Sequence, residues 1–198
     1  MKALHFALLA LACAFPLRAD NWIQNGDFVD GINHWRGNGR APSDFAPDNP
    51  LDKPDPLTSK GLIIPLRHGV WDKVEQDFHG KSASGVVTIT YMVSPDLTFS
   101  TNPDDYANMP EQIHYDGWQA FNTPPGDWVV FIADFGSEGG AHGTYWEIKP
   151  ELGSSKPQTF RVQVKGLTPL EDKTITLAFP PGDGKLVILN VSLTDNQP

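Results

Sequence analysis

Residues 21–35, NWIQNGDFVDGINHW, decide the fold of this chain, because they lead from an apolar strand through a tight turn to a tryptophan. The pair Asn25-Gly26 predicts a turn whose backbone adopts positive φ. Phe28 then points back into a core, and Gly31 permits a second change of direction. We therefore expect Trp35, which closes the stretch, to follow Phe28 into the interior.

Strand-forming runs separated by turn residues extend through the rest of the chain. The sequence holds 18 glycines and 18 prolines, and the β-rich runs lie between them. Only the first residues have helical character. We expect strands at residues 62–66, 74–78, 86–93, 128–135, 144–148, 159–164, 174–179 and 186–193.

Three of these runs indicate how the strands are covered. Residues 160–165 and 174–179 alternate between apolar and polar, which predicts one core face and one solvent face. Residues 128–133 are apolar on both faces, so we expect a central, covered strand. The pattern predicts an all-β fold, a two-sheet antiparallel β-sandwich (jelly roll). The Pro- and Asp-rich residues 40–60 fit a long surface loop inside one domain, residues 20–198.

Both ends of the chain carry a family resemblance. The run Asn25-Gly26-Asp27-Phe28, followed by Gly31 and Trp35, resembles the opening of galactose-binding-like jelly-roll modules, the cellulose- and xylan-binding modules among them. Residues 186–194, LVILNVSLT, resemble the last strand of the same modules. Between these ends, residues 71–78 resemble the glutamine-bearing strand of that family.

The resemblance implies a non-catalytic carbohydrate-binding module whose partner is a poly- or oligosaccharide. Residues 40–60 and 95–127 match nothing in that family. Two alternatives stay open, because this sandwich also serves other roles. One is an exported structural or adhesion domain with a protein partner, and the other is a small polysaccharide lyase or hydrolase.

The first 19 residues are typical of a secretory signal peptide. Lys2 gives a basic start, residues 3–15 are apolar, and the small residue Ala19 ends the segment. The apolar run is shorter than the roughly 20 residues of a membrane span. We expect no span, cleavage after Ala19, and a protein that is secreted, periplasmic or at the cell surface. Cys13, the only cysteine, lies in this segment, and the apolar residues after it disfavour a lipoprotein anchor.

The chain is acidic, with 24 acidic against 15 basic residues and a formal charge of −9. Removing residues 1–19 takes away two basic residues and no acid, which changes this charge to −11. Nucleic acid is not an expected partner, because phosphate binding needs clustered Lys and Arg. Acidic polysaccharides are disfavoured for the same reason, unless a local basic patch overrides the net charge.

The sequence offers little for catalysis. No two histidines have a metal-binding spacing, and no serine lies in a Gly-x-Ser-x-Gly motif. Gln112-Ile113-His114 resembles a motif of jelly-roll alginate lyases, whose other motifs have no counterpart here. Carboxylate pairs for glycoside hydrolysis need only come together in space. The candidates are Asp72, Glu75, Asp77, Asp104, Asp105, Glu111, Asp116 and Glu147, which we interpret as solvated surface. We expect no catalytic residues.

Aromatic side chains are the better functional signal, because sugar rings pack on them while polar neighbours bond the hydroxyls. Residues 114–119, HYDGWQ, combine two rings with several polar groups in an irregular segment. The alternative is that these rings plug the segment back onto the strand at 128–135. The predicted ligand-binding residues are Trp118, Tyr115, Trp71, Trp146 and Gln119, with Tyr106 and Tyr145 as further rings not assigned to the core.

A structural calcium is possible but disfavoured. Many modules resembling this one hold Ca²⁺ between the first and last strands, where this chain has Val29 and Leu189. Neither side chain offers an oxygen to a cation that prefers six to eight of them. We expect Val29 and Leu189 to pack together in place of the ion, and we predict no cofactor and no metal ligand.

Overall fold

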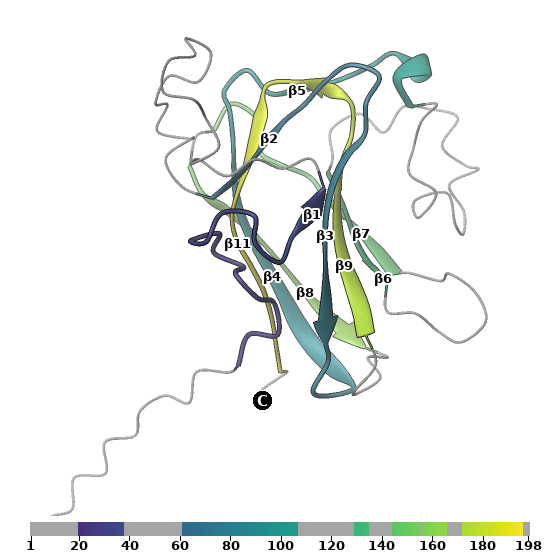
Figure 1. The fold of residues 1–198 in the computed structure, drawn as a ribbon. Coiled ribbons are helices and arrows are strands. Elements are labelled where there is room, and N and C mark those ends of the chain that lie inside the picture. Colours follow the sequence, from purple (N-terminus) through teal and green to yellow (C-terminus); the bar gives the residue numbers. More distant parts are fainter. Residues whose placement is uncertain are drawn as a thin grey trace, which may run out of the picture.

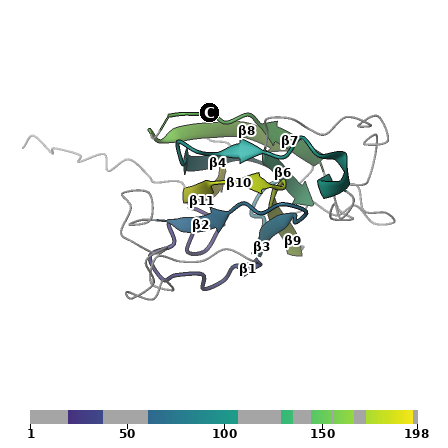
Figure 2. The same cartoon turned by 90° about the horizontal axis from the view of Figure 1, so that it is seen from above.

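The computed structural model describes residues 20–37, 61–106, 129–134, 144–154, 156–165 and 172–195. Apart from one 3-10 turn, η3 (Pro103–Tyr106), its regular structure there is entirely strand. Figure 1 shows the two main sheets facing each other, and Figure 2 shows them from the end that carries β5 and β10. The predicted two-sheet antiparallel β-sandwich is confirmed. No helix of the described residues has the length and apolar character to cross a membrane.

One sheet has five strands in the order β1-β3-β9-β6-β7, and every neighbouring pair is antiparallel. The strands are β1 (Arg36–Gly37), β3 (Asp72–His79), β9 (Asp172–Phe179), β6 (Val129–Asp134) and β7 (Thr144–Ile148). The run at 128–133, predicted to be central, forms β6, which has a neighbour on each side.

The other sheet has four strands in the order β2-β11-β4-β8, again all antiparallel. Its strands are β2 (Leu62–Pro65), β11 (Lys185–Asp195), β4 (Ser84–Val93) and β8 (Gln158–Lys165). At one end of the sandwich, β5 (Thr98–Phe99) pairs with β10 (Gly182–Asp183). All eight predicted runs are strands, because alternation and turn residues are local signals.

The core lies between the two sheets and is made of alternate residues of their strands. In β3, Val74 and Phe78 are buried while Asp77 and His79 are exposed. β8 alternates as predicted. The solvent face predicted for β9 is wrong, because Thr176 and Ala178 on its other face are also buried. Both are short side chains between the neighbouring strands β3 and β6.

The segment before β1 is fastened to both sheets. Gln76, buried in β3, accepts a hydrogen bond from the Gln24 backbone N–H (2.7 Å) and donates one to the Gln24 carbonyl (2.9 Å). On the other side, the Trp22 N–H donates to the Leu193 carbonyl, and the Val191 N–H donates to the Gly26 carbonyl, both at 2.8 Å. The segment therefore covers the edge of β11 beyond the short strand β2.

The turn itself differs from the prediction in detail. Trp22 is buried, but it lies in bends and turns instead of the expected apolar strand. Positive φ occurs at Asn25 (46°) and Phe28 (56°), whereas Gly26 is required for another reason. A Cβ atom at Gly26 would overlap the backbone carbonyl oxygen of Val191. Phe28 and Trp35 are both in the core, as predicted.

Candidate functional site

The outer face of the five-stranded sheet carries a row of polar side chains. Lys73, Glu75 and Asp77 alternate along β3 with residues of the core, so they project from the opposite face. In register, Arg36 of β1 lies opposite Glu75, and Glu75 lies opposite Thr176 of β9. We name Arg36, Lys73, Glu75, Asp77 and Thr174 the outer row.

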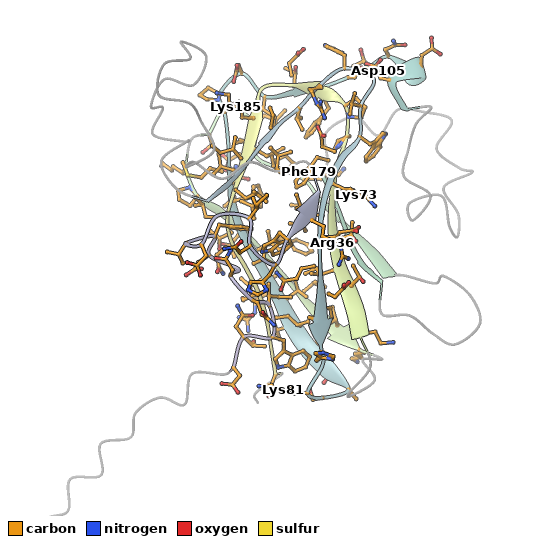
Figure 3. The ribbon with its side chains drawn as sticks, viewed as in Figure 1. Arg36, Lys73, Lys81, Asp105, Phe179 and Lys185 are labelled. Carbon is orange, nitrogen blue, oxygen red and sulfur yellow. The ribbon has the colours of Figure 1, made fainter. Side chains whose placement is uncertain are left out.

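The outer row is held together by direct contacts. The Arg36 guanidinium binds Asp77 with two nitrogens, Nη1 to Oδ2 at 2.6 Å and Nη2 to Oδ1 at 2.9 Å. Its Nε donates to Glu75 Oε1 at 3.3 Å, and Lys73 Nζ lies 3.2 Å from Glu75 Oε2. The Thr174 hydroxyl donates to Asp77 Oδ1 at 2.8 Å. Figure 3 shows Arg36 and Lys73 close together in its view, on β1 and β3.

These contacts fix the charge of the outer row. The Arg36 guanidinium, followed by the Thr174 hydroxyl, lowers the pKa of Asp77 to about 2. The same carboxylate raises the pKa of Arg36. The side chains of Arg36 and Asp77 are still 55% and 48% exposed. Arg36 and Asp77 therefore offer charged donors and acceptors to solvent, and Asp77 is ionised at any physiological pH.

Three of the predicted ligand-binding residues, Tyr115, Trp118 and Gln119, lie outside the described residues. The fourth, Trp71, is buried with 7% exposed, so its ring presents no open face to a ligand. The fifth, Trp146, lies in β7 opposite Phe131, and only its backbone is described.

Register assigns the two aromatic residues of β7 to opposite faces of the sheet. Trp146 is two positions from Ile148, a core residue, and so occupies a register position of the core face. Tyr145 lies opposite Ile132 of β6, and Ile132 lies opposite Thr176 of β9. Thr176 in turn lies opposite Glu75, a residue of the outer row. By backbone position, Tyr145 therefore shares the face of the outer row. Tyr106 ends η3, and its side chain is not described either.

The candidate carboxylates are spread over the fold. The interpretation of Asp72 as solvated surface is wrong, because Asp72 is buried and forms an ion pair with Arg67. Glu75 and Asp77 belong to the outer row. Asp104 and Asp105 lie in η3, and Glu147 lies in β7. Glu111 and Asp116 are outside the described residues, as are Gln112, Ile113 and His114. Among the described residues, the carboxyl pKa values that shift, at Asp20, Asp77 and Asp105, are all lowered.

The predicted contact between Val29 and Leu189 is wrong. Val29 is 77% exposed at the tip of the turn, while Leu189 packs partly against Ile63 and Val187. The tight turn around Phe28 directs Val29 outward, because Phe28 takes the core position. In the described ranges, no group of three or more His, Cys, Asp or Glu residues is arranged to hold a metal ion.

Sequence reasoning missed Arg36 and Thr174. Arg36 follows a core tryptophan in a two-residue strand, and its partner Asp77 is 41 positions away. A usable signal was present in β3, where Lys73, Glu75 and Asp77 alternate with apolar or amide side chains. That alternation predicts a charged outer face on β3. It does not predict that Arg36 binds the carboxylates of this face.

Comparison with known proteins adds information on the fold. No protein-family model matches this chain, and neither does any curated protein. Solved structures similar to it include a family 61 carbohydrate-binding module in complex with beta-1,4-galactotriose, at 12% identity over 90% of this chain and 100% of that chain, with a TM-score of 0.49. A family 16 carbohydrate-binding module covers 88% of this chain and 100% of its own, at 12% identity and a TM-score of 0.49.

Parts of enzymes also share this fold. The enzymatically active domain of tailspike protein 4 from bacteriophage CBA120 aligns with 88% of this chain over 21% of its own length, at 11% identity and a TM-score of 0.50. At such identities the similarity concerns the fold alone. The fold itself is the two-sheet antiparallel β-sandwich described above.

Proposed function

We propose that this chain is an exported, non-catalytic glycan-binding domain whose binding surface includes the outer face of the five-stranded sheet. The observation that carries the proposal is the outer row. Arg36, Lys73, Glu75, Asp77 and Thr174 place charged donors and acceptors side by side across three strands and leave the central Arg36–Asp77 pair half exposed.

The outer row supplies the groups that recognise sugars. A sugar hydroxyl both donates and accepts hydrogen bonds, so it can bridge a carboxylate and a guanidinium or hydroxyl group. Because the side chains already hold one another in place, little side-chain freedom is lost when a ligand binds. Aromatic rings complete such a surface by packing on sugar C–H faces. Tyr145 by register, and Tyr115 and Trp118 by prediction, are the candidates for these rings.

The charge pattern favours a neutral, hydroxyl-rich glycan. The outer row contains two cationic and two anionic side chains, which compensate one another locally. The chain as a whole has a formal charge of −9, which repels a polyanion. A neutral poly- or oligosaccharide is not repelled by this net charge and needs no excess of positive charge in the outer row.

The same chemistry supports binding without cleavage. A glycosidase needs one protonated carboxylic acid beside an ionised one. Arg36 keeps Asp77 ionised, so this carboxylate accepts hydrogen bonds and has no proton to give to a leaving group.

A glycan array combined with a cleavage assay tests the proposal. The protein from residue 20 onward is applied to neutral and acidic polysaccharides, and reducing ends and unsaturated uronates are measured in parallel. The expected result is that the protein is retained on one class of neutral glycan and releases no new reducing ends. Heat-denatured protein should not be retained. Binding to no glycan, or release of reducing ends, contradicts it.

A further inference from the structure

The end of the sandwich that carries β5 and β10 holds a histidine between two carboxylates. His68 lies in the turn that joins β2 to β3, where Arg67 and Val70 form a β-bridge. Its Nδ1 lies 3.1 Å from Oδ2 of Asp105 in η3, and its Nε2 lies 2.9 Å from Oδ2 of Asp183 in β10. One imidazole ring therefore joins three segments that are far apart in the sequence.

This geometry requires a particular protonation state. A neutral imidazole has one N–H donor and one acceptor nitrogen, whereas an ionised carboxylate only accepts. Each ring nitrogen has a carboxylate oxygen at hydrogen-bond distance. The neutral ring donates to one of these oxygens, while the lone pair of its other nitrogen faces the second oxygen and repels it. The imidazolium donates to both. In agreement, Asp105 and then Asp183 raise the pKa of His68.

The carboxylate on the η3 side is itself held in place. Asp105 Oδ2 also accepts the Ser100 hydroxyl, and Oδ1 lies 3.4 Å from Asn102 Nδ2. These contacts, Ser100 first and His68 second, lower the pKa of Asp105. The side chain of Asp105 is 13% exposed, against 64% for Asp183. Asp105 is thus the fixed partner of His68, and Asp183 is the one that is free to separate.

We propose that His68 is a pH-dependent clamp: as an imidazolium it holds the β2–β3 turn, η3 and β10 together, and on losing its proton it releases Asp183. A histidine with a raised pKa in the folded protein stabilises the fold fully below its unfolded value of 6.5 and loses that contribution as the pH rises through the folded value. The clamp is therefore fully closed below pH 6.5 and opens as the pH rises through the folded pKa of His68, which lies above 6.5.

Few other charges in the described part of the chain bear on this ring. Arg67, its neighbour in the turn, is bound to Asp72. From η3 come Asp104 and Asp105, and from β10 comes Asp183. β5 has no titratable residue. Lys185 follows Asp183 by two positions and does not contribute to the raised pKa of His68. The pH response should therefore follow His68 itself.

Nuclear magnetic resonance tests the clamp on the folded protein. The ring ¹⁵N shifts of His68 and the exchange protection of the Gly182 amide, which donates to the Arg67 carbonyl, are followed from pH 5.5 to 9. We expect both ring nitrogens to be protonated at pH 6. As the ring titrates, Gly182 protection should fall by about two- to fivefold, as for an exposed charge-assisted contact.

Two variants make the result decisive. His68→Gln, an exposed substitution, should show the lower Gly182 protection at both ends of the range, with no change as the pH rises. His34→Asn alters an exposed histidine in the segment before β1 and should behave as the wild type. A neutral His68 ring at pH 6 overturns the proposal. So does Gly182 protection that stays constant while His68 titrates, or that retains its pH dependence in His68→Gln.

Discussion

The two faces of β3 belong to the same eight residues and have opposite roles. On one face, Val74 and Phe78 are buried between the sheets; on the other, Glu75 and Asp77 meet solvent beside Arg36. A step of one residue thus separates side chains that pack in the core from charged side chains that meet solvent. The comparison implies that substitutions on the inner face change stability, whereas substitutions on the outer face change binding with little effect on stability.

The largest effect is expected at Trp35, which directly precedes Arg36. Its ring lies 5.3 Å from the ring of Phe28, and its indole N–H donates to the Asn25 carbonyl at 3.2 Å. Trp35→Ala should lower the free energy of unfolding by about 3–5 kcal/mol, measured by urea denaturation. Ile32→Ala, at a residue that is 40% exposed, is the control. Equal losses for the two variants would show that Trp35 does not anchor the core.

A smaller loss is expected at Gln76, a buried polar residue of β3. Gln76→Leu keeps the volume but removes both hydrogen bonds to the Gln24 backbone. We expect a loss of about 1–3 kcal/mol, because the Gln24 groups are left without their partner. Exchange of the amides before β1 should accelerate in the same variant. Unchanged stability and unchanged exchange would mean that this segment is held by its contacts to β11 alone.

Substituting Arg36 should barely change stability. The Arg36–Asp77 pair is about half exposed, and exposed ion pairs contribute roughly 0–1 kcal/mol. Asp77 should titrate at about 2, so its contribution is present above 3.8 and lost as the pH falls through about 2. In Arg36→Gln, carboxyl ¹³C titration should place the Asp77 midpoint higher. A midpoint that is the same in both proteins is the result that would count against the contact.

No effect is expected from calcium. The positions at which the family resemblance implies calcium ligands hold Val29 and Leu189, and Val29 is exposed to solvent. Melting curves recorded with EDTA and with millimolar CaCl₂ should therefore superimpose. A rise of several degrees with calcium would show that Asp27, Asp30 and Asn190 suffice to bind the ion.

The sequence predicted the elements of the fold better than their contacts. Strands such as β8 follow from alternation, which each run displays by itself. The charged face of β3 was also visible, but Arg36 depends on the pairing of β1 with β3, which joins residues about 40 positions apart. Trp71 was misjudged as an exposed ring, because its local sequence does not show whether the fold covers it, and the structure leaves only 7% of it exposed.

The most direct test of the account compares two arginines on opposite sheets. Arg36 lies in the outer row, and Arg161 is an exposed residue of β8 in the four-stranded sheet. Each is changed to Gln, and calorimetry measures the affinity for the neutral glycan that the wild type retains. Arg36→Gln should weaken binding by roughly 10- to 100-fold, the size of lost charge-assisted hydrogen bonds. Arg161→Gln should bind as the wild type, and both variants should melt within a few degrees of it. Equal affinity of Arg36→Gln and the wild type would contradict the assignment of binding to this face.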